Sequence, residues 1–323
     1  MSIPTVTVAS YIFHGVSVEI SGDDAQVAGA LASRLAPFCR PLQNGTDIGV
    51  TITSGDPASL ERPPGHGRPV YDPLDGEVLY FEASDLLFIR YAQEARLIAA
   101  PGRGTIAMAV RTGPAATWAA SHALFTLAFI ECLKRRARFS LHAAGLAVGG
   151  RAILVAGTSG SGKSTTAVAL LRAGFEFLSD DMVFLLPGGD GLTVGGFPDE
   201  IDVTSETIRL FPELAGLTGA AANPVNGKRS FRPEAIYDVA LGRPCAPAAL
   251  VLAGTRVPGP SRLEAVGADE ALLELAPNVL LTDAAAAQAH LEALAELTRA
   301  CPCYRLQAGP RMEELPGLFA PLV

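Results

Sequence analysis

The stretch Ile153-Leu-Val-Ala-Gly157-Thr-Ser-Gly-Ser-Gly162-Lys163-Ser164 decides the fold of this 323-residue chain. In it, a short apolar run meets a glycine-rich turn, and an alternating apolar segment, Thr165–Arg172, follows at once. This is the G-x-x-x-x-G-K-[ST] phosphate-binding pattern, with a strand before it and a helix after it. Glycines let backbone N–H groups converge on an anion, and the positive end of the helix dipole faces the same point. The motif therefore predicts an α/β fold that binds the phosphates of a nucleotide.

The residues expected to contact ATP lie in the turn and the first turn of the helix. Lys163 is placed for the β- and γ-phosphates, and Ser164 for Mg²⁺. The full set in this loop is Gly157, Thr158, Ser159, Gly160, Ser161, Gly162, Lys163, Ser164 and Thr165.

The composition is that of a globular protein, with 49% hydrophobic and 18% charged residues. The net charge of −8 argues against nucleic acid as the main partner. The five cysteines are scattered, and Met1–Ser10 lacks the basic and apolar regions of a secretory leader. We therefore expect reduced thiols and a cytoplasmic location. The short spacing of Cys301-Pro-Cys303 argues against a zinc site.

One apolar stretch, Ala115–Ile130, has no formal charge and is followed by the basic run Lys134-Arg-Arg-Ala-Arg138. A membrane span needs about 20 apolar residues, and this stretch is shorter and contains several polar side chains. It therefore predicts a buried helix whose basic end suits the helix dipole, and no membrane partner is expected.

The chain is expected to hold two domains, because Gly113-Pro114 breaks it. Residues 1–112 predict an α+β domain that is a scaffold or recognises the substrate, and residues 113–323 hold the phosphate loop. Gly149-Gly150 predicts a two-residue hairpin between strands Ser140–Val148 and Arg151–Ala156. The central sheet of the second domain is expected to be mostly parallel, with antiparallel edge or hairpin strands.

Two adjacent carboxylates, Asp180 and Asp181, follow the strand Phe175–Leu178, one helix and one strand beyond Lys163. The carboxyl ends of parallel strands meet at one edge of a sheet, where ligands bind. One carboxylate there can hold Mg²⁺, and its neighbour can accept a proton from an attacking hydroxyl. The alternative interpretation is a turn or helix-capping pair.

His142 is expected on the strand next to the one that enters the phosphate loop. It is either a packed core histidine or a side chain that orients a carboxylate or donates to a phosphate oxygen. The polar segment Thr218–Pro233 is expected to be a mobile loop. Its basic side chains either close over the phosphates or face solvent; they are Lys228, Arg229 and Arg232.

A family resemblance rests on three motifs in order: His142-Ala-Ala-Gly-Leu-Ala-Val, the phosphate loop, and Phe177-Leu-Ser-Asp180-Asp181. Together they resemble the catalytic domain of HPr kinase/phosphorylase. They resemble still more closely the HPr-kinase-related kinases of bacterial peptide-maturation clusters, including those of lasso peptides. The resemblance covers Phe139–Leu186 and implies a P-loop kinase domain of the HPr kinase/PEP carboxykinase-like type.

The resemblance implies transfer of the γ-phosphoryl group of ATP to a serine hydroxyl of a precursor peptide or small protein. It assigns catalytic roles to Lys163, His142 and Asp180, with Asp180 favoured as the base. Asp181 and Ser164 are then linked to Mg²⁺, although the order of the two carboxylates is left open. Whether the protein is a homo-oligomer is also left open.

This sequence departs from HPr kinase/phosphorylase in two places. Thr165 stands where that family usually has Glu after the loop, and the Glu-x-Arg-Gly signature is missing from Ile201–Glu213. A kinase with a substrate other than HPr is therefore favoured. The alternatives are a bifunctional HPr kinase/phosphorylase in carbon regulation, a small-molecule kinase, and a regulatory ATP-binding module without an acceptor.

Overall fold

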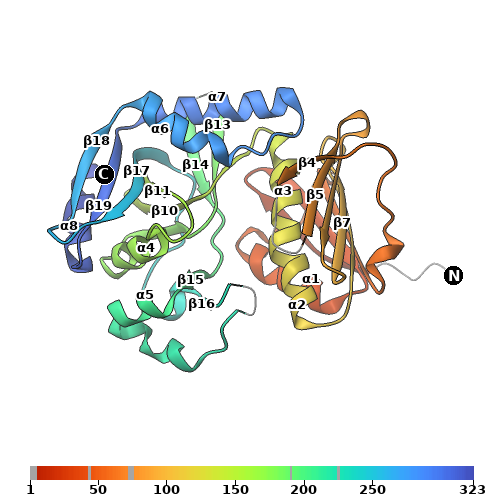
Figure 1. The fold of residues 1–323 in the computed structure, drawn as a ribbon, viewed down its shortest axis with the longest axis horizontal. Coiled ribbons are helices and arrows are strands. Elements are labelled where there is room, and N and C mark those ends of the chain that lie inside the picture. The colour runs from red at the N-terminus through yellow and green to blue at the C-terminus, as the bar shows by residue number, and fades with distance from the viewer. Residues whose placement is uncertain (1–5, 43–44, 72–75, 190, 224–225) are drawn as a thin grey trace. The chain divides into compact units, whose positions relative to one another are not determined.

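The protein has a mixed α/β structure, seen in a computed structural model that describes residues 6–42, 45–71, 76–189, 191–223 and 226–323 (Figure 1). The α/β class expected from the sequence is thereby confirmed. The chain divides into two compact units. The first comprises Met1–Arg138 and Leu280–Ala289, and the second comprises Phe139–Val279 and His290–Val323.

The first unit is built on an eight-stranded sheet with the strand order β1-β2-β3-β8-β7-β6-β5-β4. Strands β2, β3 and β8 are parallel neighbours, and the remaining pairs are antiparallel. The bounds are β1 Val6–Phe13, β2 Val16–Gly22, β3 Ile48–Ser54, β4 Arg68–Tyr71, β5 Gly76–Phe81, β6 Leu86–Tyr91, β7 Ala95–Ala100 and β8 Thr105–Val110. Thr5, the first residue of an expected strand, lies outside the described residues.

Helix α1, Ala25–Leu35, begins after Asp24, whose carboxylate accepts hydrogen bonds from the backbone N–H groups of Gln26 and Val27. Such a cap satisfies donors that a helix start leaves free. The buried Arg34 donates from this helix to the carbonyl of Ser121.

The apolar helix of the first unit runs from Pro114 to Lys134 as α2 Pro114–Ala119, a π-helical turn Ala120–Leu124, and α3 Phe125–Lys134. It is long and apolar enough to cross a membrane, but 67% of its most apolar window is buried inside the structure. That burial is typical of a core helix, as the sequence predicted. Because this helix belongs to the first unit, the units divide at Arg138 rather than near Gly113.

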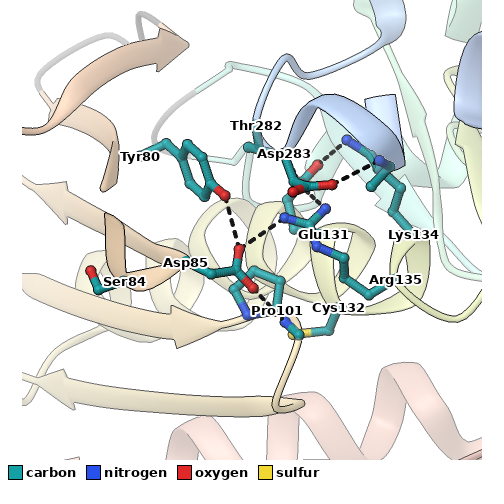
Figure 2. Close-up of polar contacts among 12 residues, drawn as sticks. Tyr80, Ser84, Asp85, Pro101, Glu131, Cys132, Lys134, Arg135, Thr282 and Asp283 are labelled. Carbon is teal, nitrogen blue, oxygen red and sulfur yellow. Dashed lines mark hydrogen bonds and ion pairs between the residues drawn. The ribbon is translucent and has the colours of Figure 1, made fainter. Parts of the chain in front are cut away.

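A buried polar cluster fastens the segment Leu280–Ala289 to α3 (Figure 2). The Glu131 carboxylate is fully buried and accepts hydrogen bonds of 2.5 Å from both Lys134 Nζ and Thr282 Oγ1. Lys134 Nζ also donates to the Leu280 carbonyl at 2.8 Å. Burial lowers the pKa of Lys134, and the Glu131 charge opposes this effect. We call Glu131, Lys134 and Thr282 the Glu131 cluster.

The next residue of the helix extends this network toward the sheet. Arg135 Nη2 donates to Asp85 Oδ1 at 2.9 Å, and Tyr80 Oη donates to the same oxygen at 3.0 Å (Figure 2). Burial and the Asp85 carboxylate raise the pKa of Tyr80 to about 12. Arg135 Nη1 lies 3.8 Å from Glu131 Oε2, so Arg135 links the Asp85 carboxylate to the Glu131 cluster.

The second unit contains a six-stranded sheet with the order β12-β10-β11-β17-β19-β18. Only β11, β17 and β19 are parallel neighbours, so the expectation of a mostly parallel sheet is wrong. The physical reason is connectivity, because a two-residue turn can join only antiparallel strands. The bounds are β10 Ala143–Val148, β11 Arg151–Ala156, β12 Glu176–Ser179, β17 Ala246–Arg256, β18 Arg262–Val266 and β19 Cys303–Ala308.

The turn Gly149-Gly150 makes the predicted hairpin, with Val148 opposite Arg151. Both glycines have positive φ, 56° and 79°, which two-residue hairpins require. The strand expected over Ser140–Val148 is interrupted, however. Residues Phe139–Leu141 form β9, which pairs with β13 (Val183–Gly188), whereas β10 joins the six-stranded sheet. His142 is therefore not within a strand but at the junction between two sheets.

Helix α4, Lys163–Arg172, lies beside β10 and β11 (Figure 1), and its apolar side chains share one hydrophobic cluster with the side chains of these strands. It ends at Gly174, whose φ of 88° permits the left-handed conformation that stops a helix. Around this core lie the remaining elements of the unit. They are β14 Gly191–Gly196, β15 Ile201–Val203, α5 Ser205–Leu210, β16 Arg229–Phe231, α6 Ala268–Leu275 and α8 Leu315–Phe319, while α7 Ala284–Ala300 continues from the first unit.

The segment Thr218–Pro233, expected to be a mobile loop, contains one strand, and its residues 224–225 lie outside the described part of the chain. Residues Arg229–Phe231 form β16, which pairs with β15 in a two-stranded antiparallel sheet. The helix expected over Ser205–Leu210 is confirmed as α5, with Thr204 accepting the capping hydrogen bond from Thr207 N. Pairing of β16 with β15 joins residues far apart in the chain, and such pairing leaves little local signal in the sequence.

Candidate functional site

The glycine-rich turn connects β11 to α4 in a conformation that needs its glycines. Gly157, Gly160 and Gly162 have φ values of 156°, 81° and 99°. A Cβ atom on Gly157 would lie 2.7 Å from Ser161 Oγ and 3.0 Å from Ala253 Cβ. The turn is therefore closed so tightly that a side chain at its first residue would clash.

Lys163 begins α4 and is buried, with 7% of its surface exposed. Its ammonium donates to the Gly157 carbonyl at 2.8 Å and to the Thr158 carbonyl at 3.2 Å. Burial lowers its pKa, and the carboxylates of Asp181 and Asp180 act in the opposite direction. The cation thus lies inside the turn, where an anionic ligand would meet it.

Asp180 follows β12, whose carboxyl end lies at the same sheet edge as the glycine-rich turn. Strand β10 is antiparallel to both β11 and β12, so these two strands run in the same direction although they are not neighbours. Ser164 Oγ donates to Asp180 Oδ2 at 2.8 Å. The sequence predicted this proximity from a parallel sheet, and the structure reaches it through an intervening antiparallel strand.

Two buried polar atoms at this site have no hydrogen-bond partner among the described residues: Asp180 Oδ1 and Ser161 Oγ. Asp180 is only 6% exposed, and its burial raises the pKa of the carboxyl to about 7. The Ser164 hydroxyl and the backbone N–H of Asp202 partly oppose this rise. Buried polar groups are nearly always satisfied, so both atoms retain the capacity to form a hydrogen bond with a bound group.

Asp181 and His142 form a second interacting pair, next in the chain to the pair of Asp180 and Ser164. His142 Nδ1 lies 3.1 Å from Asp181 Oδ1 and 3.0 Å from the Asp181 carbonyl oxygen. Partial burial raises the pKa of Asp181, but the contact with His142 and the charges of Lys163 and Lys228 outweigh it, so the net shift is downward. The Asp181 side chain is 73% exposed and His142 34%, so His142 is not a core histidine.

The three basic residues of the predicted loop have different interactions in the structure. The charge of Lys228 contributes to lowering the pKa of both Lys163 and Asp181. Arg229 instead donates to Ser205 Oγ and the Ala220 carbonyl, both at 3.2 Å. Arg232 lies 3.7 Å from the Glu234 carboxylate. Thr165, another predicted contact, is buried with its hydroxyl 3.0 Å from that of Thr207.

One residue near the site, Asp202, was not among the site residues predicted from the sequence. Asp202 lies in the middle of β15, between the buried side chains of Ile201 and Val203, and its backbone N–H contributes to lowering the pKa of Asp180. The signal available was a carboxylate inside a short apolar run, which is unusual unless the carboxylate has partners.

No protein-family model matches this sequence, and no curated protein is significantly similar to it. The site must therefore be judged by its chemistry. Among the described residues, no group of three or more His, Cys, Asp and Glu side chains is arranged to hold a metal ion. A cation here would rest on a hydroxyl, a carboxylate and ligand phosphates, which is the environment that Mg²⁺ commonly occupies.

Proposed function

We propose that the protein is an ATP-dependent kinase that transfers the γ-phosphoryl group to a serine hydroxyl of a peptide or small protein. The observation that carries the proposal is the buried Asp180 carboxylate, which bonds Ser164 through one oxygen and keeps the other without a partner, next to the glycine-rich turn. A turn that only capped a helix would not need an incompletely paired carboxylate beside it.

The site suits phosphoryl transfer because that reaction depends on positioning and charge neutralisation. The buried Lys163 ammonium lies in the turn, and the charge of Lys228 acts on the pKa of Lys163. Both cations would bind phosphate oxygens and stabilise the charge that develops on them during transfer. The backbone N–H groups at the start of α4 would bind the phosphates from the other side.

The geometry favours Ser164 and Asp180 as the pair that would hold Mg²⁺, because the Ser164 hydroxyl bonds Asp180 rather than Asp181. When bound, Mg²⁺ supplies charge neutralisation between the β- and γ-phosphates. A cation would also stabilise the ionised form of Asp180, whose burial otherwise favours the protonated form. This assignment reverses the one favoured from the sequence, where the order was left open.

Asp181 then acts as the base. Its carboxylate is exposed, so an acceptor hydroxyl can reach it, and its lowered pKa keeps it ionised. His142 orients that carboxylate through Nδ1. Asp181 would accept the serine proton as the hydroxyl attacks the γ-phosphorus and the bond to the β–γ bridging oxygen breaks.

The serine acceptor, the peptide-maturation role and a cytoplasmic location rest on the resemblance of Phe139–Leu186 to HPr-kinase-related kinases. HPr remains the alternative acceptor, for a kinase/phosphorylase in carbon regulation. A regulatory module that binds ATP without an acceptor is disfavoured by the two distinct carboxylate pairs, since nucleotide binding alone does not require the exposed Asp181–His142 pair.

The test is the intact mass of candidate acceptors after incubation with the protein, Mg²⁺ and ATP. The panel contains HPr and the precursor peptides encoded nearest to this gene. We expect one phosphate on a peptide serine and none on HPr. Transfer to HPr would support carbon regulation, and ATP binding with no transfer to either would support the regulatory module.

The two carboxylate roles separate in the same assay. We expect Asp181→Asn to bind Mg·ATP and to lose transfer, whereas Asp180→Asn loses Mg·ATP affinity. The opposite pattern would restore Asp180 as the base and Asp181 as the metal-linked residue.

A further inference from the structure

We propose that Arg256 is a phosphate-binding residue of this site, which exchanges its partner Glu206 for the phosphates of ATP. The inference rests on the proposed function and deepens it, since it adds a ligand residue that the glycine-rich motif does not contain. Neither Arg256 nor Glu206 was predicted from the sequence to bind ATP.

Strand β17 brings Arg256 to the edge of the sheet where the glycine-rich turn lies. It is the parallel neighbour of β11, and Arg256 is its last residue. Ala156 lies opposite Leu252 in the register, so the two strands point toward the same edge. A Cβ atom on Gly157 would lie 3.0 Å from Ala253 Cβ. The carboxyl end of β17 is therefore packed against the turn.

The chain also leaves β11 and β17 in opposite directions across the sheet. After β11 it passes through α4 to β12, the strand at one edge, and after β17 it passes to β18, the strand at the other edge. In open α/β sheets, ligands bind outside the carboxyl ends of the strands at such a point. The topology therefore places Arg256 next to the ligand expected at the turn.

A series of side-chain contacts joins Arg256 to the start of α4 by a second route. Its guanidinium forms an ion pair with Glu206, in the first turn of α5. The next residue, Thr207, is buried, and its hydroxyl lies 3.0 Å from that of Thr165. Thr165 directly follows Ser164 in the chain. Two consecutive residues of α5 thus tie the ion pair to the first turn of α4.

Helix α5 is anchored at this place, whereas the ion pair that it carries can open. Thr204 Oγ1 accepts a hydrogen bond of 3.2 Å from the backbone N–H of Thr207 and so caps the helix. The side chains of Arg256 and Glu206 are 57% and 55% exposed. Ion pairs in water contribute little to stability. A phosphate group can therefore displace the Glu206 carboxylate at small cost.

An arginine complements Lys163 in binding a triphosphate. The Lys163 ammonium is a single charge, which already bonds two carbonyls of the turn. A guanidinium can donate to two phosphate oxygens at once in a fixed geometry. Phosphoryl transfer depends on neutralising the charge of the phosphates, so a second cation at the same sheet edge favours both binding and transfer.

The test is the affinity for Mg·ATP, measured by calorimetric titration at constant ionic strength. We expect Arg256→Gln to raise Kd about 10- to 100-fold, because it removes a hydrogen bond between charged groups. Glu206→Gln should act in the opposite direction and lower Kd about 2- to 5-fold, since the guanidinium no longer has to leave a carboxylate. Equal affinity in Arg256→Gln and the wild type would overturn the inference.

The double variant Arg256→Gln/Glu206→Gln separates the exchange from a general effect of surface charge. If Glu206 acts through Arg256, its replacement has no effect once the guanidinium is gone. The Kd of the double variant should then lie within about twofold of that of Arg256→Gln. A double variant with the affinity of the wild type would show that the two charges act independently, and it would overturn the exchange.

Arg172→Gln is the matched control. Arg172 is 54% exposed, lies 3.5 Å from the Glu213 carboxylate and is the last residue of α4, at the end away from the turn. Its replacement should leave Kd unchanged. The melting temperatures of Arg256→Gln and Glu206→Gln should stay near that of the wild type. Equal losses of stability in these two variants, with unchanged Kd, would give the ion pair a structural role only and overturn the inference.

The titration also separates this inference from the proposed kinase activity. Binding of Mg·ATP by the wild type without phosphoryl transfer to any acceptor would refute the kinase, and the Kd of Arg256→Gln would still decide the role of Arg256. Transfer by the wild type, with the same Kd in Arg256→Gln, would overturn the inference alone.

Discussion

Two carboxylates are buried in different units of this protein, and they differ in their hydrogen bonds: one accepts at both oxygens, and the other at one oxygen. Glu131 in the first unit is fully buried and accepts from Lys134 and Thr282 (Figure 2). Asp180 in the second unit is almost as deeply buried, accepts from Ser164 through one oxygen, and has no partner at the other. A buried charge whose partners are complete serves structure, and one left incomplete at a sheet edge indicates a ligand site.

Two buried lysines repeat the contrast. Lys134 bonds a carboxylate and the Leu280 carbonyl, whereas Lys163 bonds only two carbonyls of the turn that it follows. Burial lowers the pKa of both ammonium groups. Lys134 forms an ion pair with Glu131, whereas no ion pair of Lys163 is found among the described residues.

The largest effect on stability should come from breaking the Glu131 cluster. Glu131→Ala leaves the Lys134 ammonium buried without its carboxylate, so we expect the free energy of unfolding to fall by about 3–5 kcal/mol. Urea denaturation followed by circular dichroism measures it. A loss below about 1 kcal/mol would mean that the cluster is not a structural ion pair.

Lys163→Ala should change function and leave stability nearly intact. Removing a cation that binds the transferring phosphates is expected to lower phosphoryl transfer by about 10²–10³-fold or more. The melting temperature should stay close to that of the wild type, because the turn carbonyls can bond water. Turnover near the wild-type value would contradict the role of the glycine-rich turn.

Asp180→Asn should stabilise the nucleotide-free protein at neutral pH. The folded pKa of about 7 lies above the ordinary value of 3.8. The contribution of the Asp180 carboxyl to the stability of the wild type is therefore fully present below about pH 4 and is lost as pH rises through 7. We expect the variant to gain up to roughly 2–4 kcal/mol over that range, measured by denaturation in the presence of a chelator. A constant difference between pH 4 and pH 8 would show that Asp180 is not perturbed.

The smallest effect should follow from Thr282→Val, which keeps the shape of the side chain and removes one donor to Glu131. We expect a loss of about 1–2 kcal/mol, since Lys134 still bonds the carboxylate. Phosphoryl transfer per folded molecule should be unchanged. A fall in transfer without a fall in stability would show that the segment Leu280–Ala289 influences the site.

Local patterns in the sequence predicted much of the second unit. The glycine-rich turn, the Gly149-Gly150 hairpin and the helix Ser205–Leu210 each depend on residues close together in the chain, and each is present. The nearness of Asp180 and Asp181 to the glycine-rich turn was also predicted, although from a parallel arrangement of neighbouring strands that the structure does not have.

Features that depend on distant pairing were not predicted. The strand break at His142 arises because β9 pairs with β13 and β10 with other strands. The hydrogen bond from Asn226 Nδ2 to Asp202 Oδ2 joins the start of the segment before β16 to β15, and it depends on the pairing of these two strands. The return of Leu280–Ala289 to the first unit depends on contacts with Glu131 and Lys134, more than 140 residues earlier in the chain. None of these three features produces a periodic pattern of apolar and polar residues within a short stretch of the chain.

The most direct test of the contrast between the two buried lysines is calorimetric titration of Mg·ATP into the wild type, Lys163→Ala and Lys134→Ala. We expect saturable binding by the wild type, no detectable binding by Lys163→Ala, and wild-type affinity for the folded fraction of Lys134→Ala. Equal affinity for ATP in the wild type and Lys163→Ala, or no binding by the wild type, would contradict it.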